Sequence, residues 1–349
     1  MNAIKNIQEP LLELSEVAII PSKTSKISSR TLECKARDDY GKLPVFVSPM
    51  DCVINEGNFE LFNKDFHAIY PRTIDIQTRI HLMMNHRPAR WVAFGLNEVK
   101  TIIKMIDTGL LNLIGDVKIC IDQANGHMED LLTYGKMLRE RLVTRESEIM
   151  VGNIANPRAI NTIAYNDFAD WVRIGIGGGS VCTTSVQTGV HYPMASLITE
   201  CHFYQTAFMY GDKRRLKIIA DGGIGDSGEI CKALALGADA VMCGRLFCTC
   251  EESASPMNEM LRVKSYWGMS TKQAQKSMGG DGNKNSEGII EMIPVECTLQ
   301  NRTDQIESAI KSSMSYCNAH NLNEFRTNAI LSRITPAAYA AYQKPIQNK

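Results

Sequence analysis

The chain has 349 residues, and its 38 Lys and Arg balance its 38 Asp and Glu, so the formal net charge is zero. This balance argues against a basic surface and against a nucleic-acid partner. The apolar runs are short and interrupted and the N-terminus lacks an apolar signal core, so we expect neither a membrane span nor secretion. Eleven cysteines without zinc or disulfide spacing fit a reducing compartment, and we expect a cytoplasmic protein.

Apolar, β-rich segments recur along the chain after a short predicted strand at residues 17–21. Eight of them end in small or polar residues, and they begin at Val45, His67, Arg90, Val117, Glu148, Trp171, Leu216 and Asp239. Segments with helical periodicity lie between them, for example after Met128 and after Ser227. Apolar strands that alternate with helices favour a parallel sheet covered on both faces, and eight units predict a closed (β/α)₈ TIM barrel of the α/β class. A doubly wound open sheet is the alternative.

Polar residues cluster where these strands end, which is the active face of such barrels. They are Asp51, Arg72, Asp122, Asn125, Asn153, Cys182 and Asp221. We expect a single barrel domain over residues 1–349, with an N-terminal arm, a mobile flap at about 270–290 and a C-terminal extension. The long unit after Cys182 predicts an extra loop or short helix over the site.

The strand at Trp171 runs into a glycine-rich loop that ends in Ser180 and Cys182. Its glycines are Gly175, Gly177, Gly178 and Gly179. Glycines allow close backbone approach, and exposed N–H groups beside a hydroxyl suit a phosphate. A cysteine just beyond is placed to attack the rest of the ligand. The alternatives are a loop that binds nothing and a buried, inert thiol.

Three further positions have the chemistry of a nucleotide site. Asp221 can accept from ribose hydroxyls, and the glycines after it suit phosphate, although an ordinary strand-to-helix turn would look the same. Arg245 follows the last strand, where barrels frequently bind phosphate; a solvated arginine is the alternative. Glu287 lies in the polar flap without an obvious helical partner.

Several motifs in the same order resemble the family of IMP dehydrogenase and GMP reductase. They are PVFVSPMD, CIDQANG, GSVCTT, TGVHYP, IADGG, ALGADAVMCG, YWGMST, SEGII and ESAIKSSMSYCNA, spread between about residues 14 and 335. The resemblance implies a (β/α)₈ barrel that forms a homotetramer. About twenty residues separate the second and third strands, where dehydrogenases usually carry a regulatory insert, and the flap lacks their Arg-Tyr pair. Both features favour the reductase, whereas SEGII and MSYCNA are closer to the dehydrogenase.

The resemblance also implies a reaction, in which GMP is reductively deaminated to IMP and ammonia with NADPH. Cys182 would form a covalent intermediate at C2 of the purine, and Thr184 and Glu287 would handle the proton. One alternative is an IMP dehydrogenase without the insert, which converts IMP to XMP with NAD. The others are a reductase of a deoxy- or modified purine nucleotide and a non-catalytic nucleotide-binding barrel.

Binding residues follow from the same motifs. The nucleoside monophosphate would contact Met50, Ser180, Asp221, Gly222, Gly223, Gly244, Arg245, Gly268, Met269 and Ser270. The cofactor would contact Asp122, Gln123, Ala124, Asn125, Gly126 and Lys284. Potassium would bind the carbonyls of Gly175, Gly177 and Cys182. The chain departs from the family pattern at Gly178, Ser185, Arg245 and Lys284.

Overall fold

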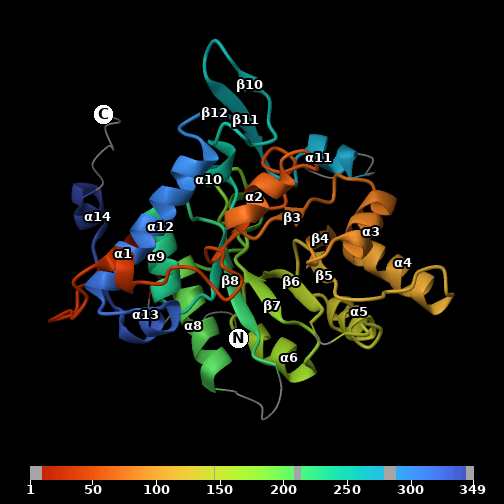
Figure 1. Ribbon diagram of the computed structural model, residues 1–349, viewed down its shortest axis with the longest axis horizontal. Helices are drawn as coiled ribbons and strands as arrows, with labels where there is room; N and C mark the ends of the chain where they lie inside the picture. Colours follow the sequence, from red (N-terminus) through yellow and green to blue (C-terminus); the bar gives the residue numbers. More distant parts are fainter. Residues whose placement is uncertain (1–9, 145, 208–213, 279–287, 343–349) are drawn as a thin grey trace, which may run out of the picture.

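The computed structural model describes residues 10–144, 146–207, 214–278 and 288–342 (Figure 1). Eight parallel strands form the central sheet. They are β2 (Val45–Val47), β3 (Ile69–Tyr70), β4 (Trp91–Phe94), β5 (Lys118–Asp122), β6 (Glu148–Ile154), β7 (Trp171–Ile174), β8 (Lys217–Asp221) and β9 (Ala240–Cys243). The sheet order is β2-β9-β8-β7-β6-β5-β4-β3, and a parallel bridge between Phe46 and His67 joins its two edges. The predicted barrel is confirmed, and the open sheet is excluded.

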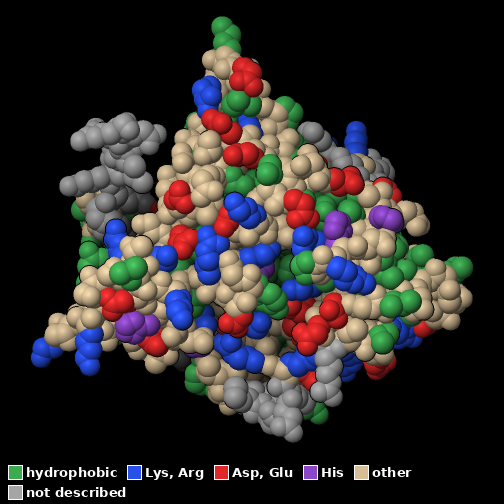
Figure 2. Space-filling view, in the orientation of Figure 1, with side chains coloured by type: hydrophobic (Ala, Val, Ile, Leu, Met, Phe, Trp, Pro, Cys, Tyr) green, Lys and Arg blue, Asp and Glu red, His purple; other side chains and the backbone are tan. Residues whose placement is uncertain are grey.

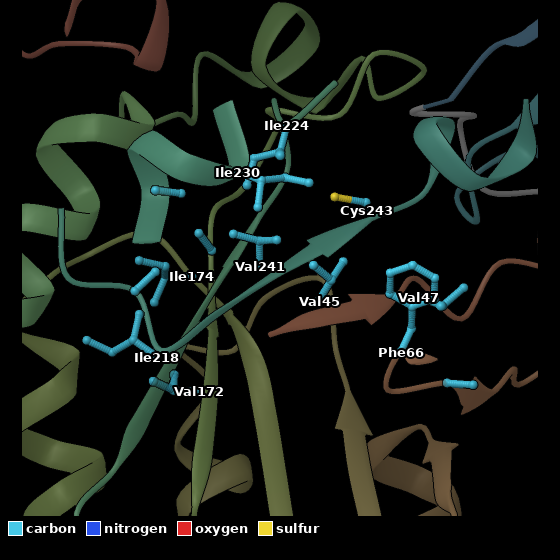
Figure 3. Packing of buried hydrophobic residues seen from close by; sticks show 14 of the residues in the cluster. Val45, Val47, Phe66, Val172, Ile174, Ile218, Ile224, Ile230, Val241 and Cys243 are labelled. Carbon is cyan, nitrogen blue, oxygen red and sulfur yellow. The ribbon is translucent and has the colours of Figure 1, made fainter. Parts of the chain in front are cut away.

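Both faces of the barrel strands are buried, which explains their continuous apolar sequences. Side chains that point to the barrel axis form an inner cluster, in which Phe46 and Trp171 meet edge to face at 5.3 Å between ring centroids. Their neighbours along the strands, such as Val45 and Val172, face the helices and join a larger outer core (Figure 3).

Helices cover the barrel from outside. They are α2 (Phe59–Asp65), α3 (Ile76–Asn85), α4 (Leu96–Asp107), α5 (Glu129–Arg139), α6 (Ala159–Asn166), α8 (Met194–Ala207), α9 (Ser227–Ala235) and α12 (Leu299–Tyr316). Side-chain caps fix several of their starts: Asp226 accepts from the Glu229 N–H, and Thr298 from the Asn301 N–H. The helices predicted after Met128 and Ser227 are therefore confirmed.

Two small antiparallel sheets lie outside the barrel. The predicted first strand, β1 (Val17–Ile20), pairs with β13 (Ile330–Arg333). The second sheet contains β10 (Met257–Asn258), β11 (Val263–Trp267) and β12 (Ile290–Pro294), and it projects from the barrel at the top of Figure 1. The sequence analysis did not predict this second sheet.

Short helices complete the described fold. They are η1 (Leu14–Glu16), α1 (Arg30–Glu33), α7 (Thr184–Thr188), α10 (Arg245–Cys248), α11 (Lys272–Ser277), α13 (Leu322–Asn328) and α14 (Pro336–Tyr342). The short helix expected after Cys182 is α7. All eleven cysteines are free thiols. Acidic and basic side chains are interspersed over the face shown in Figure 2. Across the described residues, no helix combines the length and the hydropathy that a bilayer crossing requires.

Candidate active site

A cavity of about 850 Å³ opens at the carboxyl ends of the barrel strands. Every strand contributes to its wall, either with its last residues or with the loop that follows. The wall includes Met50 after β2, Arg72 after β3 and Gly95 after β4. It continues through Asp122, Asn153, Cys182, Asp221 and Gly244 from the five remaining strands. The structure therefore brings together the strand-end residues that the sequence predicted at one rim, except Asp51 and Asn125.

Cys182 is half-buried in the cavity wall, at the end of the glycine-rich loop and just before α7. Its thiol donates to the hydroxyl oxygen of Thr184, with 3.3 Å between Sγ and Oγ1. Across the cavity edge, Cys182 forms an isolated antiparallel bridge with Gly288, and the Ile289 N–H donates to the Val181 carbonyl at 3.0 Å. The predicted residues Lys284 and Glu287 lie outside the described residues.

One end of the cavity has the character of an anion site. Ser180, Gly222, Gly223 and Gly244 line it together. Gly244 is required by close approach, because a Cβ there would lie 2.8 Å from the Met50 sulfur and 2.9 Å from the Tyr266 hydroxyl. Gly268, Met269 and Ser270 follow β11 and line the adjoining wall.

The sequence analysis missed Tyr266, although it quoted the YWGMST motif that contains it. Tyr266 is buried, its hydroxyl lies beside Gly244, and it lines the same cavity end. Burial raises the pKa of Tyr266, so its hydroxyl keeps its proton and remains a donor. The signal that would have found it is the tyrosine itself, an aromatic residue with a hydroxyl group next to the last residue of β11.

Arg245 also lines this end, but its guanidinium is paired with Glu291 on β12. The hydrogen bond to Glu291 is the main cause that raises the pKa of Arg245. The predicted contact between Arg245 and a phosphate is compatible with the place of Arg245 in the cavity wall. Its guanidinium is, however, already paired with a carboxylate.

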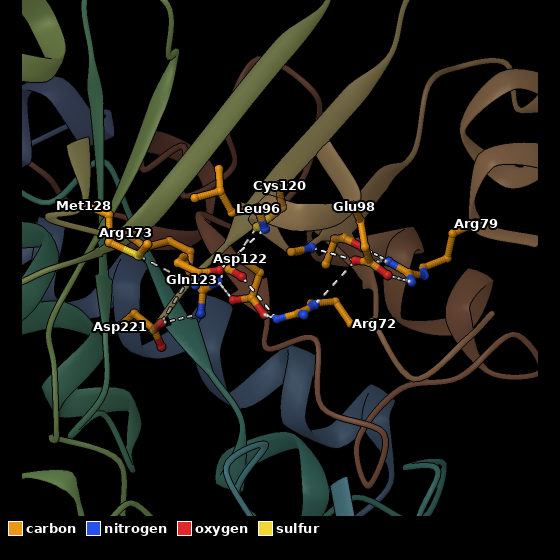
Figure 4. Close-up of polar contacts among 12 residues, drawn as sticks. Arg72, Arg79, Leu96, Glu98, Cys120, Asp122, Gln123, Met128, Arg173 and Asp221 are labelled. Carbon is orange, nitrogen blue, oxygen red and sulfur yellow. Dashed lines mark hydrogen bonds and ion pairs between the residues drawn. The ribbon is translucent and has the colours of Figure 1, made fainter. Parts of the chain in front are cut away.

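A second missed residue, Arg173, lines the cavity and lies between Asp122 and Asp221 (Figure 4). It comes from β7 and joins two carboxylates, with Nη1 2.5 Å from Asp122 Oδ1 and Nη2 2.8 Å from Asp221 Oδ2. Asn153 donates to the same Asp221 oxygen at 2.7 Å. Burial opposes the charge, but Asp221 and Asp122 outweigh it and hold the pKa of Arg173 well above its usual value. The sequence signal that would have found Arg173 is a single cation inside an otherwise apolar strand.

The chain of charges continues toward the outer part of the cavity (Figure 4). Arg72 lies 3.8 Å from Asp122 and 3.7 Å from Glu98, and Glu98 pairs with the buried Arg79 at 2.5 Å. Burial would raise the pKa of Glu98, but hydrogen bonds from Arg79 and from the Gly95 N–H lower it. The part of the site around Arg72 and Glu98 therefore presents positive and negative charges that alternate and are held in place by their pairing.

The cofactor residues predicted from CIDQANG are split by the turn after β5. Asp122, Gln123 and Ala124 line the cavity, whereas Asn125 and Gly126 do not belong to its wall. The Asn125 side chain instead accepts from the His127 N–H at 3.1 Å. Gly126 packs so closely that a Cβ would lie 2.7 Å from the Asn153 carbonyl oxygen.

Asp51 does not line the cavity wall and instead forms a hydrogen bond that stabilises the fold. Its Oδ1 accepts from the Trp267 indole N–H at 2.8 Å, which ties the loop after β2 to β11.

The glycine-loop carbonyls predicted to bind potassium already accept hydrogen bonds. The Gly175 carbonyl accepts from Asn153 at 2.8 Å, and the Gly177 carbonyl accepts from the Ser185 hydroxyl at 3.1 Å. A cation there would have to share both oxygens with these donors, through their second lone pairs. The described ranges also contain no group of three His, Cys, Asp or Glu side chains able to hold a metal ion.

Comparison with known proteins matches residues 92–343 to the model of the IMP dehydrogenase / GMP reductase domain. GMP reductase from Photobacterium profundum is 30% identical over 363 aligned positions, which cover 97% of this chain and 99% of that protein. GMP reductase 1 from Homo sapiens is 28% identical over 93% of this chain and 95% of that protein. Inosine-5'-monophosphate dehydrogenase from Chlorobaculum parvum is 35% identical over 233 residues, but the match spans only 45% of that protein.

Proposed function

Because the chain belongs to the IMP dehydrogenase/GMP reductase family, we propose that it is an oxidoreductase of purine nucleoside monophosphates and, within that class, a GMP reductase. The observation that carries the proposal is the meeting of Cys182 and Thr184 with the anion site in one cavity. The end-to-end similarity to GMP reductases, against a partial similarity to the dehydrogenase, favours the reductase.

In this proposal the anion site holds the nucleotide by its phosphate. The Ser180 and Tyr266 hydroxyls and the backbone N–H groups around Gly223 and Gly244 donate to the phosphate oxygens. Asp221 accepts from the ribose through Oδ1, because Oδ2 is taken by Arg173 and Asn153. The purine then lies over Cys182, between Met50 and the segment at Gly268.

The Cys182 thiol gives up its proton as its sulfur forms a bond to C2 of the purine, and the 2-amino group leaves as ammonia. After C2 has received a hydride, the bond between C2 and the sulfur breaks, which releases IMP and regenerates the thiolate. Ammonia needs a proton to leave, and the Thr184 hydroxyl, 3.3 Å from the sulfur, is placed to relay one. Glu287 is the proposed source of that proton. NADPH, when bound along the outer cavity wall at Asp122, Gln123 and Ala124, supplies the hydride that replaces the amino group. Arg173 holds Asp122 and Asp221 in fixed orientations, so cofactor and ribose contacts share one anchor.

The remaining family expectations enter as proposals. We propose a homotetramer and a cytoplasmic location on the family resemblance alone. Potassium has little support, because Asn153 and Ser185 already occupy two of the carbonyls it would need. No step of the proposed reaction depends on potassium.

An IMP dehydrogenase is the second candidate, favoured by the 35% identity to that enzyme over 233 residues. Loss of NADPH absorbance with GMP, with release of ammonia, is expected for the reductase. Gain of NADH absorbance with IMP would establish the dehydrogenase instead. A panel of nucleotides that includes deoxy-GMP tests whether the enzyme prefers ribose or deoxyribose. If no purine nucleotide is turned over, the non-catalytic nucleotide-binding barrel would be the remaining alternative.

The nucleophile is tested by Cys182→Ala, which we expect to lower kcat roughly a thousandfold or more while GMP still binds. Cys201→Ala is the matched control, because that thiol is fully buried in α8 away from the cavity. Equal activity of the two variants would exclude Cys182 as the nucleophile.

A further inference from the structure

Four cationic side chains line the described cavity, and each is paired with a carboxylate. Arg72 and Arg173 share Asp122, Lys100 pairs with Asp130, and Arg245 pairs with Glu291. A nucleotide phosphate carries a charge of about −1.5 to −2 at neutral pH. A phosphate that approaches one of these arginines therefore competes with a carboxylate for the guanidinium.

Only the Arg245 pair is placed at the anion site. Arg245 begins α10 directly after Gly244, and it lines the cavity together with Ser180 and Gly223. Glu291 reaches it from β12, where it is the direct cross-strand partner of Tyr266 on β11. Directly opposed residues of an antiparallel pair project to the same face, so Glu291 lies on the face that carries the Tyr266 hydroxyl.

The same pair is easier to exchange than the pairs of Arg173. The Arg245 and Glu291 side chains are 34% and 38% exposed, whereas Arg173 is 8% exposed. Exposed ion pairs contribute little to stability, while an arginine bound to phosphate forms stronger, two-pronged hydrogen bonds. The buried Arg173 pairs would cost far more to open.

We propose that Glu291 is an internal competitor for the nucleotide phosphate, and that Arg245 exchanges Glu291 for the phosphate when the nucleotide binds. Glu291 thereby sets the affinity and makes it depend on the charge of the ligand: a dianionic phosphate displaces the carboxylate, and a nucleoside without phosphate does not. The inference rests on the proposed function for the nature of the ligand, but not for any catalytic step.

The test is calorimetric binding of GMP and of guanosine to the full chain, without cofactor. Glu291→Gln keeps the size of the side chain but frees Arg245, and we expect GMP to bind two- to fivefold more tightly. Arg245→Ala should weaken GMP binding about tenfold. In the double variant, removal of Glu291 should bring no gain, and guanosine should bind all variants alike.

Glu251→Gln is the matched control, because Glu251 forms an exposed ion pair with Arg262, the residue just before β11. It changes the net charge equally and should leave the GMP affinity unchanged. The exchange is overturned if Glu291→Gln leaves the GMP affinity unchanged, tightens guanosine equally, or still tightens GMP without Arg245. It is also overturned if neither GMP nor inorganic phosphate binds any variant. GMP binding with the expected pattern but without NADPH consumption would overturn the proposed function and leave the exchange standing.

Discussion

At the scale of single residues, Arg173 has the largest structural consequence in the site. It contacts both Asp122, on the side proposed for the cofactor, and Asp221, on the side proposed for the ribose. The role of Arg173 could not be predicted from the sequence pattern. A charged residue in the middle of an apolar strand is unfavourable unless it has partners, and its two partners lie on other strands. Sequence patterns describe one strand at a time, whereas burial of the Arg173 charge is tolerated only because carboxylates pair with it.

Arg173→Met should therefore lower the free energy of unfolding by up to about 3–5 kcal/mol, because it leaves the half-buried Asp122 and Asp221 without their shared cation. Urea unfolding followed by circular dichroism measures the change. Arg141→Met is the control, since Arg141 pairs with the half-exposed Asp107 and should change stability by about 1 kcal/mol or less. Equal losses in both variants would mean that the charge of Arg173 is not what stabilises this part of the cavity wall.

At the scale of elements, the N-terminal arm is fastened to the glycine-rich loop by one histidine. His191 Nε2 lies 2.7 Å from Glu13, and His191 Nδ1 lies 3.0 Å from the Ile176 carbonyl. Burial opposes the charged ring, but Glu13 and the Ile176 carbonyl outweigh it and raise the pKa of His191. Both ring nitrogens then donate, which only the protonated ring can do.

This contact makes stability depend on pH in a definite direction. With a folded-state pKa above the unfolded value of about 6.5, the contribution is complete below pH 6.5 and disappears as the pH rises through the folded value. His191→Asn should lower the Tm at pH 6 and have almost no effect at pH 8.5. The energy is at most about 1 kcal/mol, because the two side chains are 31% and 41% exposed. His81→Asn, an exposed histidine on α3, should show no such pH trend.

The packing of α5 gives a second prediction for an element. Gly135 is buried in the middle of this helix, and a Cβ there would lie 2.3 Å from the Phe168 ring. An alanine usually stabilises a helix by about 0.5–1 kcal/mol relative to glycine, but overpacking a core costs about 1–3 kcal/mol. Gly135→Ala should therefore be net destabilising in thermal unfolding, and a raised Tm would show that Phe168 yields freely.

At the scale of the whole molecule, the barrel was predictable and its additions were not. The eight strands were found because each is an apolar run buried on both faces, a pattern that local sequence carries by itself. The sheet of β10, β11 and β12 was not predicted because it is a small outer sheet with exposed apolar side chains such as Ile290 and Met292 on β12. Local patterning is weak where burial is partial.

The candidate site divides in the same way. Glycines, Cys182 and Asp221 were found because loop composition marks them without reference to the rest of the fold. The pairing of Arg245 with Glu291 could not be found, because the partners are 46 positions apart and meet only after β12 folds back beside β11. Nothing in the order of residues specifies that contact before the topology is known.

The pairing of the first and last barrel strands also limits when the anion site can exist during synthesis. Met50 follows β2 and Gly244 follows β9, and the two become neighbours only when β2 and β9 pair. A nascent chain that has left the ribosome only as far as Asp239 lacks β9, Gly244 and Tyr266. It can contain Cys182 but not the complete anion site, so a ligand of that site can assist only the last stage of folding, after nearly all of the barrel has been made.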